Sequence, residues 1–381
     1  MRLRIGPLIL LLLTVFYLSS CVAWVENRDF SRDPPLIKDK SVPEFFKTDK
    51  GYHCEMHWYK EPEKENSYYK VYSFVQYNSA NWYASSSIGG ELYIPKKLRS
   101  PDYFIVLPGM NLDYPAQRIA DRLATFGFPV IRIYSGFDPL PKYIINGLAD
   151  EKDPKYILKK VESLFLEYIQ NHTANLMRLM DYLSNFDSAE QKVVENPIKP
   201  RSFHVAGYSL GGIEAALLAG VDSRIESLLM ISASGSLARI FTDCPATIVK
   251  SIGSLHVLLF NKFGMNKESV YVELKKSLRN VEPNTYASRV DPSRVVMVTG
   301  CLDLLGIIDT AIPYSAAQET WEAFKKPEWI NLLFYGHVTS LAIIAPVWIE
   351  LPTMHIILFE SYLDHILKSH YLPKALKENH R

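Results

Sequence analysis

A serine stands at the centre of GYSLG, residues 207–211, with small residues on both sides of it. The residues before it, FHVAG, are short, apolar and β-prone, and the following IEAALLAG is rich in strong helix formers. The pattern therefore predicts a strand, a tight turn and a helix, with Ser209 in the turn. In that context the motif G-x-S-x-G is typical of a nucleophilic serine whose hydroxyl is exposed at the top of a sheet.

Steric constraints explain why glycines surround this serine. A strained turn between a strand and a helix needs small flanking residues, because Cβ atoms there would collide with neighbouring backbone. Gly207 and Gly211 meet this demand, and Gly212 allows the helix to pack close to the sheet. The turn places Ser209 at a helix N-terminus, where N–H groups and the dipole favour negative charge. The N–H of Leu210 is then a candidate oxyanion-hole donor.

Short apolar segments alternate with helical segments through most of the chain. The expected strands are FIVLPG (104–109), VIRIYS (130–135), FHVAG (203–207), SLLMISA (227–233), VVMVTG (295–300) and INLLFYG (330–336). The expected helices between several of them lie at 114–127, 158–186 and 213–220. This alternation predicts an α/β protein with a doubly wound, mostly parallel sheet.

Two regions depart from the alternation. Before it, segments around 53–60, 67–77 and 89–95 alternate aromatic and β-branched residues, which predicts N-terminal antiparallel strands. Later, residues of about 237–292 form an insertion of mixed apolar and basic character. An insertion of that length must have structure of its own, and we expect a cap over the active site. Its segment SIGSLHVLLFNKFG either supplies apolar walls for an acyl group or only packs the cap onto the domain.

With this motif in this alternation, residues 85–365 resemble the α/β-hydrolase superfamily of serine esterases and lipases. The resemblance implies a Ser-His-Asp triad that cleaves carboxylic esters or thioesters through an acyl-enzyme. In that family the second oxyanion donor comes from a loop after an earlier strand, often written His-Gly. FIVLPGMN has Pro108 and Gly109 at that place, so the N–H of Met110 is the candidate donor. Pro108 replaces the usual histidine but leaves the backbone donor intact.

The same resemblance points to the other two members of the triad. His337 follows the apolar segment INLLFYG directly, as the family's last catalytic residue follows its final strand. Two carboxylates compete for the acid: Asp303 lies three residues after Gly300, and Asp309 lies four residues before Pro313. We favour Asp303, because a strand end fixes position better than a loop, and keep Asp309 as the alternative.

The first residues have the composition of an export signal. Arg2 and Arg4 precede the apolar run PLILLLLTVFYL, which ends in LSSC at residues 18–21. LSSC resembles the lipobox of bacterial lipoproteins, which would make Cys21 the lipidated first residue of a membrane-anchored protein of the bacterial envelope. The alternatives are simple secretion with Cys21 incidental, or an uncleaved anchor formed by the uncharged residues 5–25.

The predicted organisation is a signal at 1–21, a polar, proline-containing tether at 22–50 and one hydrolase domain at 51–381 with the cap insertion. The 381 residues are 48% hydrophobic, enough for a large core, and the formal net charge of +1 without a basic cluster predicts no nucleic-acid partner. Cysteine spacing gives no metal-binding pattern, so we expect no metal site and no cofactor.

The expected partners are a small-molecule acyl ester and a membrane reached through the N-terminal lipid or anchor. Two other functions remain open on the sequence alone. One is transfer of the acyl group to an acceptor other than water. The other is a catalytically inactive hydrolase fold that serves as a binding protein.

Overall fold

The computed structural model describes residues 23–26, 41–43, 46, 54–58, 64–78, 87–110, 113–134, 147–185, 194, 198–244, 250–300 and 312–332. Its strands are β1 (Ala23–Glu26), β2 (Cys54–Trp58), β3 (Lys64–Glu65), β4 (Tyr69–Asn78), β5 (Ile88–Pro95), β6 (Tyr103–Leu107), β7 (Val130–Ile133), β8 (Phe203–Tyr208), β9 (Ile225–Ile231), β10 (Val295–Gly300) and β11 (Glu328–Leu332). Its helices are α2 (Asp113–Thr125), α4 (Pro154–Ser184), α5 (Leu210–Val221), α6 (Leu237–Asp243), α7 (Lys250–His256), the π-helix η5 (Val257–Lys262), α8 (Lys267–Ser277) and α9 (Tyr314–Ala323).

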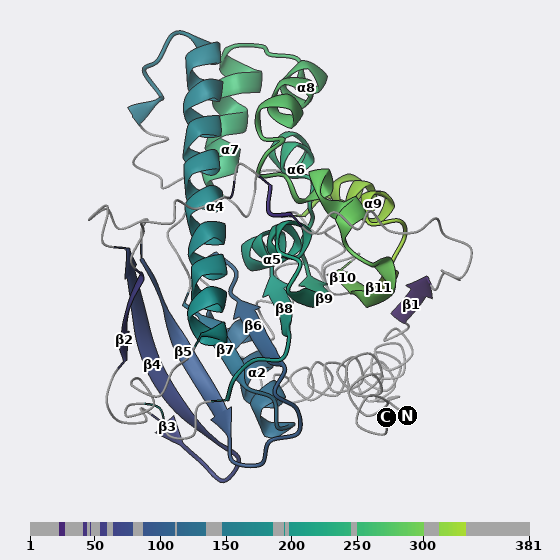
Figure 1. Ribbon diagram of the computed structural model, residues 1–381. Coiled ribbons are helices and arrows are strands. Elements are labelled where there is room, and N and C mark those ends of the chain that lie inside the picture. Colours follow the sequence, from purple (N-terminus) through teal and green to yellow (C-terminus); the bar gives the residue numbers. More distant parts are fainter. Residues whose placement is uncertain are drawn as a thin grey trace, which may run out of the picture.

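The strands form one sheet in the order β1-β11-β10-β9-β8-β6-β7-β5-β4-β2, with β3 paired to β4 (Figure 1). From β7 to β11 the neighbouring strands along this order are parallel. The N-terminal strands β2, β4 and β5 pair antiparallel with one another, and β5 pairs antiparallel with β7. This arrangement confirms the predicted fold class, a doubly wound and mostly parallel sheet with antiparallel strands at its N-terminal side.

The central strands are buried on both faces, as their continuous apolar sequences require. All five residues of β6 are buried, and alternate side chains point to opposite faces. Phe104 and Val106 belong to a core with the apolar face of α2. Ile105 and Leu107 belong to the larger core with α4 and α5. Helices on both faces therefore fix the height and tilt of the strands whose carboxyl ends build the site.

The insertion after β9 is helical. It contains α6, α7, η5 and α8, followed by three short 3-10 turns between Pro283 and Arg294. It packs on the first half of the long helix α4, where the ring of Phe165 meets the ring of Phe241 edge-on at 4.8 Å. Lys262 also donates a hydrogen bond to the carbonyl of Ala149, just before α4 begins. The insertion thus has the secondary structure that its length predicted; its role as a cap stays a prediction.

Helix α4 begins earlier than the expected residue 158. Asp153 accepts a hydrogen bond from the backbone N–H of Lys155, and Pro154 occupies the first turn. Both features favour a helix start, because proline has no N–H to leave unsatisfied and the aspartate satisfies one of the orphan donors. The helix then runs for 31 residues to Ser184 and reaches from the insertion down one face of the sheet.

Parts of the segment 22–50, expected to be a tether, contact the domain. β1 pairs antiparallel with β11, with Ala23 opposite Leu332. Phe46 is buried, and its ring lies edge-on to Tyr286 at 6.2 Å. No helix within the described residues is long and apolar enough to cross a membrane. Residues 1–22, including Cys21, lie outside the described residues, so the signal and its lipid stay predictions.

Candidate active site

Ser209 lies between the end of β8 and the start of α5, and its backbone is strained. Its φ is 54° and its ψ is −120°, a region that residues with a side chain rarely adopt. Such a conformation costs about 1–3 kcal/mol and persists only where the surroundings hold it. Here the N–H of Ser209 donates to the carbonyl of Ile231 at 2.9 Å, and its own carbonyl accepts from Gly212 and Ile213. The strand–turn–helix placement predicted for this serine is therefore the one observed.

The two glycines of the motif, and Gly212 directly after it, leave no room for a side chain. A Cβ at Gly207 would lie 2.1 Å from the carbonyl oxygen of Gly211, and a Cβ at Gly211 would lie 2.3 Å from that of Pro108. A Cβ at Gly212 would lie 2.3 Å from the Cβ of Ala233. These contacts are far below van der Waals distance, so with the present neighbours there is no space for a larger residue at these positions.

The loop after β6 lies directly against this turn. A Cβ added to Gly109 would be 3.3 Å from the Cβ of Ser209 and 2.9 Å from the ring of Tyr208. The structure thus brings the loop that ends in Met110 beside the turn that carries Leu210. This is the adjacency that two converging N–H donors need. That these two N–H groups bind an oxyanion stays a prediction.

Asp303, Asp309 and His337 lie outside the described residues. The strands that lead to them are described, and both leave the sheet at the edge where Ser209 lies. Tyr208 pairs with Ile231 of β9, which pairs with Val298 of β10, and Val298 pairs with Ile330 of β11. The carboxyl ends of β8, β10 and β11 therefore lie along one rim of the sheet, which we call the catalytic rim.

The distances along this rim allow the predicted triad. Strands lie about 4.8 Å apart, so β10 is about 10 Å and β11 about 14 Å from β8. The chain spans up to about 3.5 Å per residue. Asp303 is three residues beyond the end of β10 and His337 five residues beyond the end of β11. Chain length alone therefore excludes none of these three residues as a partner of Ser209, and it does not decide between the two carboxylates.

Solved structures with a similar arrangement include two esterases. The acetyl xylan esterase from Paenibacillus sp. R4 matches with a TM-score of 0.50 and 17% identity, over 83% of this chain and 89% of that chain. Acetyl xylan esterase 1 from Thermoanaerobacterium sp. JW/SL YS485 matches with a TM-score of 0.46 and 16% identity, over 80% of this chain and 93% of that chain. The chain has the α/β-hydrolase fold. No family model matches the sequence, and no curated protein does.

In this α/β-hydrolase fold, a buried ion pair that sequence analysis missed joins α4 to α5. The Nδ1 atom of His172 lies 3.0 Å from a carboxylate oxygen of Glu214, and both side chains are largely buried. Burial disfavours the charged imidazole, but the neighbouring Glu214 carboxylate outweighs burial and raises the pKa of His172. Glu214 is five residues after Ser209. In the sequence, this ion pair could have been suspected from the single carboxylate in the otherwise apolar helix IEAALLAG.

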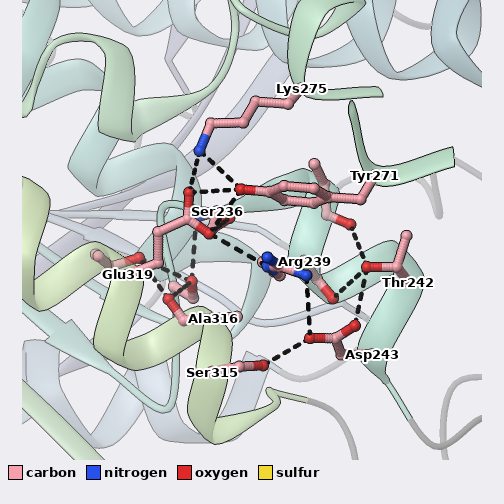
Figure 2. A network of polar contacts seen from close by, with 12 residues as sticks. Ser236, Arg239, Thr242, Asp243, Tyr271, Lys275, Ser315, Ala316 and Glu319 are labelled. Carbon is pink, nitrogen blue, oxygen red and sulfur yellow. Dashed lines mark hydrogen bonds and ion pairs between the residues drawn. The ribbon is translucent and has the colours of Figure 1, made fainter. Parts of the chain in front are cut away.

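A network of polar contacts joins the helical insertion to α9 (Figure 2). The Glu319 carboxylate of α9 accepts hydrogen bonds from Ser236 at 3.0 Å and from Tyr271 at 3.1 Å, and it pairs with Lys275 of α8. Beside it, Ser315 donates to Asp243 of α6 at 2.7 Å. α9 follows the segment that carries Asp303 and Asp309. The network therefore holds α9 against the insertion.

Glu282 is buried close to this network, and its carboxyl group has no ion-pair partner in direct contact within the described residues. Its side chain is 2% exposed, and neither carboxylate oxygen has a hydrogen-bond partner within the described part of the chain. Burial, reinforced by the charge of Glu319, raises the pKa of Glu282 to about 8. Glu282 therefore holds a proton at neutral pH, because burial and the charge of Glu319 outweigh the attraction of Lys275 and the contact with Ser236.

Metal ligands were not expected from the sequence. Within the described ranges, no group of three or more His, Cys, Asp or Glu side chains is placed to hold a metal ion.

Proposed function

We propose that the protein is a serine hydrolase that cleaves carboxylic esters or thioesters through an acyl-enzyme on Ser209. The observation that carries this proposal is the strained backbone of Ser209 in a turn where Gly207, Gly211 and Gly212 leave no room for a side chain. Strain of this kind is maintained at functional sites, since a turn without a function could relax it by a single substitution. The loop of Met110 against the same turn supports the proposal, because an acyl-transfer site needs donors beside its nucleophile.

The orientation of Ser209 also supports a nucleophilic role. A serine at an ordinary helix N-cap accepts hydrogen bonds from the first turn with its side-chain oxygen. Ser209 occupies the N-cap position of α5 but makes no such side-chain bond. Its hydroxyl is therefore not used to cap α5, while the dipole of α5 stabilises negative charge at the turn.

In the proposed mechanism, His337 takes the proton of Ser209 Oγ as this oxygen attacks the acyl carbonyl. Asp303, or Asp309 in the alternative, holds the imidazole in the required tautomer and stabilises its charged form. The N–H groups of Leu210 and Met110 stabilise the oxyanion. His337 then gives its proton to the leaving alcohol or thiol. Water activated by the same histidine releases the acid and restores Ser209.

The proposal extends to where the protein acts. We propose that residues 1–21 direct export and that Cys21 carries the lipid that holds the protein on the membrane of a bacterial envelope. Secretion without a lipid is one alternative, and it would leave the wild-type protein free of membranes; an uncleaved anchor is the other. Cys21→Ala should release the protein from membranes if the lipid anchors it, whereas unchanged membrane association would indicate an uncleaved anchor.

Labelling with a fluorophosphonate probe tests the catalytic proposal. Wild-type protein should be labelled, and Ser209→Ala should abolish both labelling and cleavage of short-chain esters. Ser232→Ala is a matched control, because Ser232 also has a positive φ, of 46°, and directly follows the neighbouring strand β9. It should keep both activities. Labelling of folded Ser209→Ala at the wild-type rate would refute the proposal. An unlabelled wild type would favour the inactive binding protein, and ester products formed with alcohol acceptors would indicate acyl transfer.

A further inference from the structure

Helix α5, which begins directly after Ser209, is apolar apart from one side chain. Its twelve residues, LGGIEAALLAGV, contain Glu214 as the single polar residue, and every residue from Gly211 to Val221 is buried. Apolar burial keeps a helix in the core, but the free energy depends on the buried area and has no directional preference. The apolar surface of α5 therefore does not by itself fix how far the helix slides along its axis or rotates about it.

The glycine contacts limit the position of α5 only where it meets the sheet and its loops. Gly211 lies against the backbone of Pro108, and Gly212 lies against Ala233 after β9, so α5 is already as close to both as their atoms allow. These contacts prevent a closer approach, but they do not oppose a small slide or a small movement away. A directional contact on another side of the helix is needed to hold it in one place.

The ion pair between Glu214 and His172 of α4 is such a contact. Two residues along a helix turn by about 200°, so Glu214 points nearly opposite to Gly212, toward α4, which passes alongside α5 (Figure 1). The imidazole is itself held in place, because its ring stacks on that of Tyr168 with centroids 5.9 Å apart and planes 7° from parallel. A slide of α5 would separate two buried charges, which is costly.

Stability alone is a weak reason for this ion pair. Burial removes the hydration of both charges, and replacement of both partners by apolar residues of similar volume is often neutral or stabilising. Apolar residues cannot replace the fixed distance and direction between the two charged groups. Glu214 is five residues after Ser209, about 7.5 Å along the helix axis, so a position fixed at Glu214 is also fixed at the turn.

We propose that His172 and Glu214 are positioning residues for ester cleavage, and that their ion pair fixes Ser209 and the N–H of Leu210 where acyl transfer requires them. The proposal rests on the proposed function and adds to it two residues that do not touch the substrate. A shift of about 1 Å in a reacting group can lower the rate of the chemical step about 100-fold. Substrate binding is spread over many contacts and depends less on such a shift, so the pair acts on kcat rather than on KM.

The double variant His172→Leu/Glu214→Leu separates position from stability. Its midpoint of chemical denaturation should stay near that of the wild type, because both charges are removed together. Its kcat for a short-chain ester, normalised by active-site titration, should fall about 10–100-fold while KM stays within about twofold. The first-order step of fluorophosphonate labelling should slow by a similar factor, because it uses the same hydroxyl and the same backbone donors. Wild-type kcat in the stable double variant would overturn the proposal.

A second polar contact between the same two helices provides a matched control. Arg224 pairs with Asp222, the C-cap residue of α5, and with Asp181 of α4, each at 2.6 Å. Asp222 is about 20 Å from Ser209 along the axis of α5. Arg224→Met should therefore lower the midpoint of denaturation and leave kcat within about twofold of the wild type. An equal fall of kcat in Arg224→Met would overturn the proposal, since loss of any contact between α4 and α5 would then explain the result.

Glu214→Gln keeps the test decisive if the double variant does not fold. The substitution retains the shape of the side chain and removes its charge. Its kcat per titrated serine, at a temperature where circular dichroism shows the variant folded, should also fall about 10–100-fold, and an unchanged value would overturn the proposal. A wild type that is neither active nor labelled would refute the proposed function and the positioning role with it. An active wild type whose folded variants keep their kcat would overturn the positioning role alone.

Discussion

The carboxylate of Glu214 lies 3.0 Å from Nδ1 of His172, in a contact that ties the helix after Ser209 to the long helix α4. Both side chains are almost removed from water, with exposed fractions of 3% and 11%. Removal of one partner from such a pair leaves an uncompensated charge and typically costs about 3–5 kcal/mol. The pair therefore couples the position of α5 to the same helix on which the insertion packs.

We expect Glu214→Gln to lower the free energy of unfolding by about 3–5 kcal/mol, measured by chemical denaturation. The double variant His172→Leu/Glu214→Leu should recover most of that loss, because it removes both charges together. The pKa of His172 is raised in the folded state above its unfolded value near 6.5. The ion pair therefore contributes its full stabilisation below pH 6.5, and this stabilisation is lost as the pH rises through the pKa that His172 has in the folded protein. If Glu214→Gln lowers the free energy of unfolding as much at alkaline pH as at acidic pH, this account is wrong.

Glu282→Gln should stabilise the protein at alkaline pH. The pKa of Glu282 is raised to about 8, so the folded state retains a proton that the unfolded chain releases near 4.5. The contribution of Glu282 to the free energy of unfolding is therefore greatest below pH 4.5. It falls progressively up to about pH 8, by at most about 5 kcal/mol. The variant removes that loss, so its melting temperature should exceed that of the wild type at pH 8 and approach it at pH 4.5. Glu268→Gln, at an exposed carboxylate on α8, should change neither value.

Gly212→Ala should reduce the proposed ester hydrolysis at least 100-fold. The added methyl group would lie 2.3 Å from the Cβ of Ala233, so α5 must move away from the segment after β9 and displace Ser209. Ala233→Gly in the same chain removes the opposing methyl group and should restore much of the activity, measured as kcat/KM. Gly147→Ala meets no atom within 4 Å and should be neutral. Failure of the second substitution to rescue a folded Gly212→Ala would refute this steric explanation.

For the acid of the proposed triad, Asp303→Asn should lower kcat by about 10³–10⁴-fold, while Asp309→Asn should stay within a few-fold of the wild type. The reason is that an asparagine cannot hold the histidine in the tautomer that accepts the serine proton. Circular dichroism should show both variants folded. The opposite ranking would assign the acid to Asp309.

The sequence predicted the central strands because their apolar segments are short and end at turn residues. β8 was expected at 203–207 and occupies Phe203–Tyr208, and β10 was expected at 295–300 and occupies Val295–Gly300. α5 was expected from residue 213 but begins at Leu210. Its first turn contains two glycines, which have poor helix propensity, and the close packing against β6 and β9 overrides that preference.

Features that depend on distant contacts had no local signal. The four residues of β1 adjoin an apolar N-terminal run, and only their pairing with β11, about 300 residues later, makes them a strand. The partner of Glu214 is a histidine on a helix that precedes it by about 40 residues. In both cases the chain is compatible with several local conformations, and tertiary packing selects one.

The pairing of β1 with β11 also constrains the order in which the strands can join the sheet during folding. Residues 23–26 leave the ribosome about 300 residues before residues 328–332 do, and their hydrogen bonds to β11 cannot form until then. Closing a loop of about 300 residues costs about 5 kcal/mol of chain entropy, which four paired residues cannot repay until the sheet beside them is complete. The first strand of the chain is therefore the last to join the sheet, and amide exchange at residues 23–26 should report when folding is finished.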